Sequence, residues 1–291
     1  MKNTVSVVMP VYNSAKFVEE SIESVLNQSY EKMQLIIIND GSTDDSDAII
    51  NKYLPNDNIK YIKQLNQGPA ATRNNGIKNC DGTYIAFLDS DDVWISDKIE
   101  KQVAILERPG VDVVYTGRIN IDENGNFVND TSDRKFLSGC ILSELYVDNF
   151  VCMSSAVLKR QVFEAVGMLN EALVMSEDYE FWLRVAMRCE FDFICEPLVK
   201  YRIHPSQSSS RCLERLIAIE NIYDSLDEQL SRQISLSTIK ESKSLHHRNF
   251  GYYYMSTGDK RSAFYEYKKA FLLTPYRLSI IKHMFGLLRF R

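Results

Sequence analysis

The chain has 291 residues, of which 45% are hydrophobic and 25% charged. These are ordinary globular proportions, so the chain can bury a sizeable core and wholesale disorder is not expected. The formal net charge of -5 does not suggest general nucleic-acid binding. An acidic protein that binds phosphate groups needs a local device, such as a metal ion or the N-terminus of a helix.

Six cysteines are present, and none forms a C-x-x-C pair. Their irregular spacing indicates reduced, mostly buried thiols in a cytoplasmic protein. The apolar-rich run near the N-terminus, Val5–Met9, is too short for a signal peptide and ends at Pro10. No run approaches the roughly 18 apolar residues that a membrane span needs.

Strand and helix patterns alternate up to Asp92. Helical spacing separates four predicted strands, namely Val5–Met9, Leu35–Ile38, Ile59–Ile62 and Tyr84–Leu88, of which the first two have the apolar composition of buried strands. This alternation predicts an α/β fold, Rossmann-like, with a mostly parallel central sheet and helices on both faces. In such sheets ligands bind beyond the carboxyl ends of the strands, which is where the polar residues collect here.

The pattern loosens after Asp92. Val111–Tyr115 predicts a strand, and an Asn-Gly turn within Asp122–Asn126 predicts a hairpin. A helix is expected over Glu177–Met187 and a strand over Phe191–Ile203. From about Ser210 the pattern is purely helical. We therefore expect an α/β domain over residues 1–208 and an α-helical appendage over residues 209–291, with the boundary in a serine-rich stretch.

The sequence Asp89-Ser90-Asp91-Asp92 follows the fourth predicted strand directly. Side chains alternate along a strand, so Asp89 and Asp91 are expected on the same side. Two carboxylates held together repel each other unless a cation or a proton joins them. Mg²⁺ or Mn²⁺ suits the pair and leaves coordination positions for diphosphate oxygens. The alternative is a solvated loop with helix-capping aspartates, whereas the EF-hand pattern fails because its glycine is missing.

Three residues near predicted strand or helix ends suit a nucleotide. Asp40 can accept a hydrogen bond from the edge of a base, or it can cap a helix. Arg73 can donate to a base carbonyl or a phosphate, or it can form a surface salt bridge. Tyr12 offers a ring for stacking on a base, although a packing role is usual at such a position.

Glu177 and Asp178 open a predicted helix. Adjacent helical residues point about 100° apart, so at most one of the two aims at a given point. One interpretation is a general base that removes a proton from a substrate hydroxyl, and the other is simple stabilisation of a helix N-terminus by carboxylates. His204 either joins a metal site or is an ordinary loop residue before proline.

Seven short motifs stand in order between residues 4 and 205. They are Val5-Ser-Val-Val-Met-Pro-Val-Tyr-Asn13, Ile38-Asn-Asp-Gly-Ser-Thr-Asp44, Gln67-Gly-Pro-Ala-Ala-Thr-Arg-Asn74, Asp89-Ser-Asp-Asp92, Val166-Gly-Met-Leu-Asn-Glu171, Ser176-Glu-Asp178 and Tyr201-Arg-Ile-His204. Each motif is weak alone, but the ordered set resembles the family 2 glycosyltransferases, whose fold is GT-A. The resemblance implies transfer of a sugar from a nucleotide-sugar.

The resemblance also implies how the nucleotide would be held. Tyr12 would stack on the base, usually uracil, beside Pro10 and Val11. Asp40 would bond the imide of the base, and Arg73 would reach a base or phosphate oxygen.

The same resemblance implies a metal site and a base. Asp89 would lie near the ribose and the metal, with Ser90 beside it in the donor site. Asp91 would ligate Mn²⁺ or Mg²⁺, and His204 would join the metal or the diphosphate. The base would be Asp178, with the preceding residue, Glu177, positioning the acceptor.

Members of this family usually invert the configuration at the sugar's anomeric carbon, in one in-line displacement without a covalent intermediate. The chain lacks the Gln-x-x-Arg-Trp signature of processive members. We therefore expect one hexosyl or N-acetylhexosaminyl unit, from a UDP-sugar first of all, to be added per encounter. By resemblance alone, the acceptor is a saccharide or lipid-linked saccharide of bacterial surface polysaccharide assembly.

Residues of the helical tail match the spacing of one tetratricopeptide-like repeat, namely Phe250, Gly251, Tyr254, Gly258, Ala263, Tyr267, Ala270 and Pro275. An ordinary helical hairpin is the alternative, because a single repeat cannot form a solenoid surface. Residues 276–291 mix apolar and basic side chains. They either rest peripherally on the cytoplasmic face of the inner membrane or pack against the body of the protein. Nothing in the tail indicates an oligomeric state.

Other functions compete with sugar transfer. A sugar nucleotidyltransferase would carry a glycine-rich basic loop after the first strand, but Pro10–Lys16 contains no glycine. A dehydrogenase is disfavoured because no G-x-G-x-x-G exists. A non-catalytic nucleotide-sugar-binding module would not need carboxylates at positions 89, 91 and 178. The donated sugar, the acceptor and the linkage stay open.

Overall fold

The computed structural model describes residues 3–130, 136–207 and 211–276. The chain divides into two compact units, one of residues 1–141 and 150–207, the other of residues 142–149 and 208–291. The short segment Leu142–Asn149 thus groups with the C-terminal helices and not with its neighbours in sequence. The assignment of catalysis to residues 1–208 and of an appendage to residues 209–291 stays a prediction.

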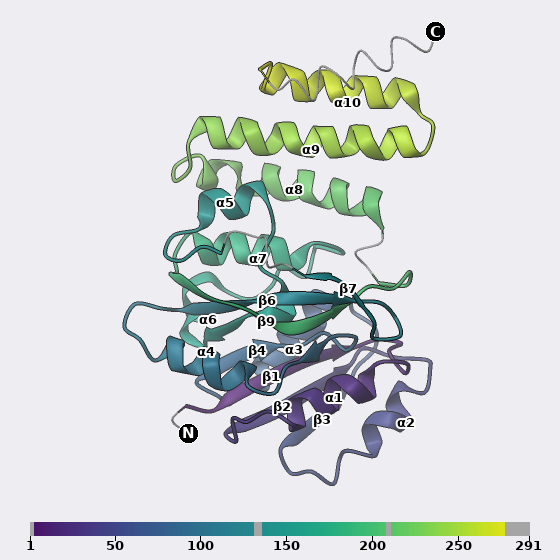
Figure 1. Cartoon of the computed structure of the whole chain (residues 1–291), viewed down its shortest axis with the longest axis vertical. Coiled ribbons are helices and arrows are strands. Elements are labelled where there is room, and N and C mark those ends of the chain that lie inside the picture. Colours follow the sequence, from purple (N-terminus) through teal and green to yellow (C-terminus); the bar gives the residue numbers. More distant parts are fainter. Residues whose placement is uncertain (1–2, 131–135, 208–210, 277–291) are drawn as a thin grey trace. The chain divides into compact units, whose positions relative to one another are not determined.

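The first unit is built on a sheet whose N-terminal half is parallel (Figure 1). Strand β1 (Val5–Val11) lies between β2 (Met33–Asn39) and β4 (Tyr84–Phe87), and β3 (Ile59–Lys63) pairs with β2. These four strands coincide with the four strands that the sequence predicts. Most residues of β1, β2 and β4 are buried, as is typical of strands that are covered on both faces, whereas β3, at the edge of the sheet, is only partly buried.

The second half of the sheet is mixed. Strand β8 (Val157–Lys159) runs antiparallel between β4 and β6 (Val113–Ile121), whereas β9 (Phe191–Arg202) is parallel to β6. The two-residue β5 (Val93–Trp94) is antiparallel to β9. The predicted hairpin is present, because β7 (Phe127–Asp130) pairs antiparallel with β6. Over the described residues, the sheet has nine strands, ordered β3-β2-β1-β4-β8-β6-β9-β5 with β7 on β6.

Helices cover both faces of β1, as predicted. Its alternate residues Val7 and Met9 belong to one buried cluster with residues of α1 and α4. On the opposite face Val8 meets Gly76 of α3. The helical segments of this unit are α1 (Val18–Leu26), α2 (Ser46–Asn51), α3 (Pro69–Lys78), α4 (Lys98–Leu106), the 3-10 turn η1 (Met153–Ser155), α6 (Gln161–Val166) and α7 (Glu177–Ala186).

The second unit is helical. Helix α9 (Leu236–Ser256) packs against α5 (Leu142–Val147), α8 (Cys212–Leu230) and α10 (Lys260–Leu273). A side chain on Gly251 would clash with Tyr267, since an added Cβ would lie 2.4 Å from its ring. The glycine therefore lets α9 and α10 approach closely, while the tetratricopeptide comparison stays a prediction. The basic and apolar segment of residues 277–291 lies outside the described residues.

None of the helices within the described residues is both long and apolar enough to span a bilayer.

Candidate active site

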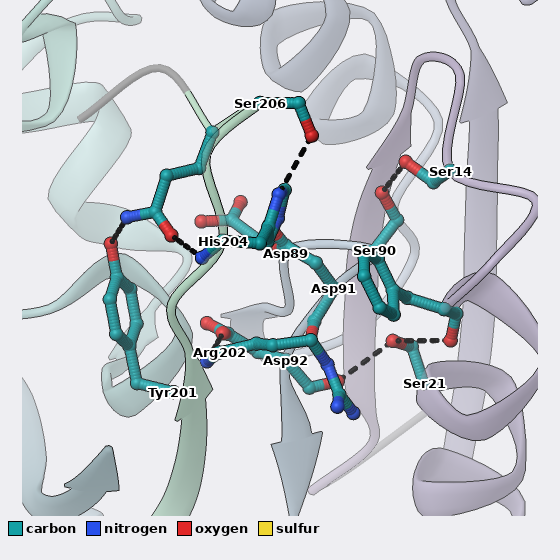
Figure 2. Close-up of polar contacts among 12 residues, drawn as sticks. Ser14, Ser21, Asp89, Ser90, Asp91, Asp92, Tyr201, Arg202, His204 and Ser206 are labelled. Carbon is teal, nitrogen blue, oxygen red and sulfur yellow. Dashed lines mark hydrogen bonds and ion pairs between the residues drawn. The ribbon is translucent and has the colours of Figure 1, made fainter. Parts of the chain in front are cut away.

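The loop after β4 carries the four-residue motif, and separate elements hold its first half (Figure 2). The backbone N–H of Asp89 donates to Ser154 Oγ of η1 at 3.1 Å. The hydroxyls of Ser90 and Ser14 lie 2.7 Å apart, and Ser14 belongs to the segment between β1 and α1. The motif is therefore fixed from two sides.

Asp92 is buried and fixes the same loop through hydrogen bonds. Its carbonyl accepts a hydrogen bond from Ser21 Oγ at 2.8 Å, and its Oδ1 accepts one from the backbone N–H of Arg202 at 3.0 Å. Burial, together with the charges of Asp91 and Asp89, raises the pKa of this carboxyl well above its ordinary value. Asp92 thus joins the loop to α1 and to β9 and does not face solvent.

Asp91 and His204 meet although they stand 113 positions apart in the sequence. His204 Nε2 lies 2.9 Å from Asp91 Oδ2, and its Nδ1 lies 2.8 Å from Ser206 Oγ (Figure 2). The Phe17 ring stands 5.0 Å from the imidazole, between ring centroids. The Arg202 guanidinium donates to the carbonyl of Asp91 at 2.9 Å. Both partners of the pair are therefore held in place by their neighbours.

This pair fits a divalent ion. Mg²⁺ and Mn²⁺ prefer octahedral coordination with bonds of about 2.1 Å, so adjacent ligand atoms stand about 3 Å apart. The 2.9 Å separation of the Asp91 oxygen and the His204 nitrogen matches that spacing. Within the described part of the chain, no cluster of three or more His, Cys, Asp or Glu side chains forms a ligand set. An ion held by these two side chains would have its other coordination positions available for water or diphosphate oxygens.

Arg73 lies between two carboxylates. It is buried on α3, where its two terminal nitrogens contact Asp89 Oδ1 at 2.6 Å and Glu177 Oε1 at 2.5 Å. Burial raises the pKa of Glu177, and the Arg73 charge opposes that effect. The sequence predicted either a donor contact or a surface salt bridge for Arg73. The observed ion pairs are internal and join the motif loop to α7.

The two carboxylates that open α7 point to different places. Glu177 is buried against Arg73, whereas Asp178 is partly exposed. Asp178 Oδ1 accepts a hydrogen bond from the backbone N–H of Tyr179 at 2.8 Å. Ser176, before the helix, has a φ of 59°, a conformation that non-glycine residues rarely adopt. Of the two carboxylates, Asp178 is the one open to a substrate.

Asp40 directly follows β2 and holds the loop before α3. Its Oδ1 accepts hydrogen bonds from Gln64 Nε2 at 2.7 Å and from the backbone N–H of Gln67 at 2.9 Å. Its Oδ2 accepts one from the N–H of Gly68 at 3.0 Å, where a φ of 87° suits glycine. The carboxylate is buried and orders the entry to α3, and it keeps acceptor capacity on Oδ2.

The segment after β1 presents an exposed ring. Tyr12 is 52% exposed, while the neighbouring Val11 is fully buried in the core and Pro10 is partly buried. Asn13 has a φ of 49°, and its Oδ1 accepts a hydrogen bond from the backbone N–H of Thr43 at 2.8 Å. The two loops that follow β1 and β2 are therefore tied together, with Tyr12 exposed beside them.

Comparison with known proteins decides the family. The sequence model of glycosyl transferase family 2 matches residues 6–167, which is more than half of the chain. An uncharacterized glycosyltransferase of Rickettsia prowazekii is 30% identical over 234 residues, covering 79% of this chain and 73% of the relative. The chain belongs to glycosyl transferase family 2. The resemblance carried by the seven motifs is confirmed.

Solved structures support the fold of this family 2 glycosyltransferase. TarS of S. aureus, solved with UDP-GlcNAc, has a TM-score of 0.63 at 16% identity, covering 94% of this chain and 93% of its own. A mannosyltransferase of Pyrobaculum calidifontis, solved with GDP-Man and Mn²⁺, has a TM-score of 0.63 at 15% identity, covering 99% and 87%. At such identities these likenesses show the fold alone. In two longer uncharacterized glycosyltransferases of Rickettsia, the chain spans 29% and 33% of the relative.

Sequence reasoning missed several residues that organise the site of this glycosyltransferase. Ser154 and Arg202 hold the motif loop through hydrogen bonds, and Ser206 contacts His204. Arg202 stands within the last of the seven motifs, so its place beside His204 was a usable signal. A lone serine in a loop or a 3-10 turn carries no comparable signal.

Proposed function

We propose that this glycosyltransferase transfers a single sugar from a nucleotide-sugar, first of all a UDP-sugar, to a hydroxyl of a saccharide or lipid-linked saccharide, with inversion. One observation carries the proposal. Arg73 contacts both Asp89, in the motif loop, and Glu177, next to Asp178. The proposed donor carboxylates and the proposed base are therefore neighbours in one site.

For the donor nucleotide, the proposed contacts gather at the ends of β1, β2 and β4. The exposed Tyr12 ring would stack on the base, with Pro10 beside it and the buried Val11 contributing through its backbone. The Oδ2 atom of Asp40 would accept a hydrogen bond from the imide of the base. In the motif loop, Asp89 and Ser90 would lie along the ribose and diphosphate.

Asp91 and His204 are the proposed ligands of the metal ion, and Asp89 is proposed to lie next to it. A bound Mn²⁺ or Mg²⁺ would neutralise the charge that grows on the leaving diphosphate. The separation of the Asp91 oxygen and the His204 nitrogen supports this assignment. The mannosyltransferase solved with Mn²⁺ shares the fold, which favours a divalent ion here as well.

Asp178 is the proposed general base. It would take the proton of the acceptor hydroxyl as that oxygen bonds to the anomeric carbon. The bond from this carbon to the diphosphate oxygen breaks, and its electron pair leaves with the nucleoside diphosphate. Because attack and departure occur on opposite faces, the configuration inverts. The partial exposure of Asp178, beside the buried Glu177, supports this choice of base.

The remaining features are proposed from the family resemblance. They are a hexosyl or N-acetylhexosaminyl donor, a role in surface polysaccharide biosynthesis, catalysis by residues 1–208, and a cytoplasmic location with peripheral contact to the inner membrane through residues 276–291.

A panel of nucleotide-sugars with and without Mn²⁺ tests the proposal, measured as release of nucleoside diphosphate in the presence of candidate acceptors and as thermal stabilisation. We expect turnover with at least one UDP-sugar, and loss of turnover with retained donor binding in Asp178→Asn. Unchanged turnover in this variant would reject Asp178 as the base. Binding without turnover by the wild-type chain on any acceptor would favour a non-catalytic binding module.

A further inference from the structure

Arg73 is a buried cation shared between two carboxylates. Its side chain is 8% exposed, and the partner side chains of Asp89 and Glu177 are 28% and 9% exposed. Burying a guanidinium is costly unless charged partners and hydrogen bonds compensate it. Here two charge-assisted hydrogen bonds do so, one from each terminal nitrogen. Arginine suits this place because its planar fork directs two nitrogens at separate acceptors.

One partner of Arg73 belongs to the proposed donor site, and the other belongs to the helix of the proposed base. Asp89 stands in the loop of the proposed donor and metal residues, where its backbone is fixed to Ser154. Glu177 is the first residue of α7, and the proposed base, Asp178, follows it directly. A shift of the guanidinium would thus move the donor loop and the base helix relative to each other.

The next residue of α3 reinforces the same link. Asn74 Nδ2 donates to the carbonyl of Leu169 at 2.9 Å and to Glu171 Oε1 at 2.8 Å, and its Oδ1 accepts from the N–H of Leu169 at 3.0 Å. These contacts hold the start of the segment that leads into α7. Two consecutive side chains of α3 therefore hold α7 and the segment before it.

The guanidinium has little surface with which to meet a nucleotide. Both terminal nitrogens are engaged with carboxylates, and Nε is buried without a hydrogen-bond partner among the described residues. A donor contact, as implied by the family resemblance, would have to use the remaining N–H groups of a side chain that is only 8% exposed.

We infer that Arg73 is a positioning residue that holds the proposed base helix against the donor loop and does not itself bind the donor. The inference rests on the proposed function, since it assigns Asp89 to the donor and Asp178 to the acceptor proton. Misplacement of reacting groups by about 1 Å costs on the order of 100-fold in rate. Loss of Arg73 is therefore expected to lower kcat and to leave donor affinity unchanged.

A double-mutant cycle tests the inference with Arg73→Gln, Glu177→Gln and the combined variant. The dissociation constant of the nucleotide-sugar, with Mn²⁺ present, and kcat are measured for each. We expect donor affinity to stay within about threefold of wild type, kcat to fall about 100-fold in each single variant, and the combined loss not to exceed the larger single loss. Arg73→Lys keeps the charge and should restore part of kcat.

A matched control comes from Arg184, an arginine on α7 that pairs with Glu180 at 2.7 Å. Arg184→Gln should lower Tm and leave kcat within about threefold of wild type, which separates loss of stability from loss of positioning.

If Arg73→Gln does not fold, Glu177→Gln must still lower kcat without weakening donor binding. The inference would be overturned if Arg73→Gln weakened donor binding tenfold and if its effect on donor binding simply added to that of Glu177→Gln in the combined variant. Absence of any sugar transfer by the wild-type chain would instead reject the proposed function.

Discussion

At the scale of single residues, the imidazole of His204 is placed between two oxygen atoms. Its Nε2 faces Asp91 Oδ2 at 2.9 Å, and its Nδ1 faces Ser206 Oγ at 2.8 Å. If Nε2 binds a metal ion it carries no proton, so the ring proton resides on Nδ1 and is donated to Ser206. A hydroxyl can accept this bond and can donate in the other tautomer. Ser206 therefore suits both forms of the ring.

Ser206→Ala is expected to weaken Mn²⁺ binding about tenfold, because the residue that orients the proposed ligand His204 is lost. Ser206→Thr keeps the hydroxyl and should bind Mn²⁺ as the wild type does. Mn²⁺ titration in the presence of a nucleoside diphosphate, followed by electron paramagnetic resonance of the free ion, measures both variants. Equal affinity of the alanine and threonine variants would refute this role of Ser206.

Lys98 is a second residue with an unusual environment. It is fully buried on α4, where its ammonium donates to Gln102 Oε1 at 2.7 Å and lies 4.1 Å from the centroid of the Trp94 ring. Burial lowers the pKa of Lys98 well below its ordinary value. Between the folded and unfolded pKa values the unfolded chain binds more protons, so this lysine makes stability rise with pH up to about 10.

Lys98→Met should therefore raise Tm at pH 7 by at least ~2 °C and flatten the increase in stability between pH 7 and pH 10. Methionine has a similar length and requires no proton. Thermal unfolding across this pH range is the measurement. A lower Tm with an unchanged pH profile would mean that the hydrogen bond to Gln102 outweighs the cost of burying the ammonium.

At the scale of elements, the packing of α3 against β1 depends on Gly76. A Cβ built on Gly76 would lie 2.3 Å from Val8 Cγ1, closer than real Cβ contacts. Glycine lowers helix propensity by about 1 kcal/mol relative to alanine, so close approach explains its presence within a helix. The same helix carries Arg73.

Gly76→Ala is expected to destabilise the chain by about 1–3 kcal/mol despite the better helix propensity of alanine. It should also lower kcat, because α3 would move the Arg73 guanidinium. The double variant with Val8→Ala opens space for the added methyl group and should recover part of both losses. Chemical denaturation and turnover measure them, and a Gly76→Ala variant as stable as wild type would contradict the packing argument.

The parallel half of the sheet could be predicted from the sequence because strand patterns alternate there with helical patterns. The antiparallel strands β5 and β8 could not. Strand β8 has three residues and β5 has two, which is too short for a period to appear. Their partners also come from distant parts of the chain, so local patterns carry no information about the pairing.

For the candidate site, the sequence predicted the residue types and the edge of the sheet where they gather. The contact between Asp91 and His204 agrees with that expectation, while their role as ligands stays a prediction. The partners of Arg73 could not be predicted, because an arginine on a helix has the same local pattern whether it faces a nucleotide or two buried carboxylates. Burial decides between these cases, and it depends on α7, far away in the sequence.

At the scale of the whole molecule, the two units carry different sensitivities to pH. In the helical unit His246 is buried between the rings of Tyr223 and Phe250, with ring centroids 5.5 Å and 5.0 Å away. Burial, helped by the neighbouring His247 and opposed by Glu266, lowers the pKa of His246 to about 4. Unfolded chain takes up this proton near pH 6.5, so the helical unit loses stability as the pH falls from about 6.5 to about 4.

His246→Leu should remove part of this acid sensitivity, because leucine fills the apolar site without binding a proton. Helical circular dichroism during thermal unfolding at pH 4.5 and pH 7 measures the effect. We expect the difference in Tm between the two pH values to shrink in the variant. A difference equal to that of the wild type would show that other groups cause the acid sensitivity.

The central claim is that Asp91 and His204 hold a divalent ion through which the chain binds a nucleotide-sugar. The most direct measurement is calorimetric titration of a UDP-sugar into wild-type chain and into Asp91→Asn, each with Mn²⁺ and with a chelator. The proposed site predicts tight binding only by the wild type with Mn²⁺, and weak binding in the other three mixtures. Equal affinity in all four would contradict it.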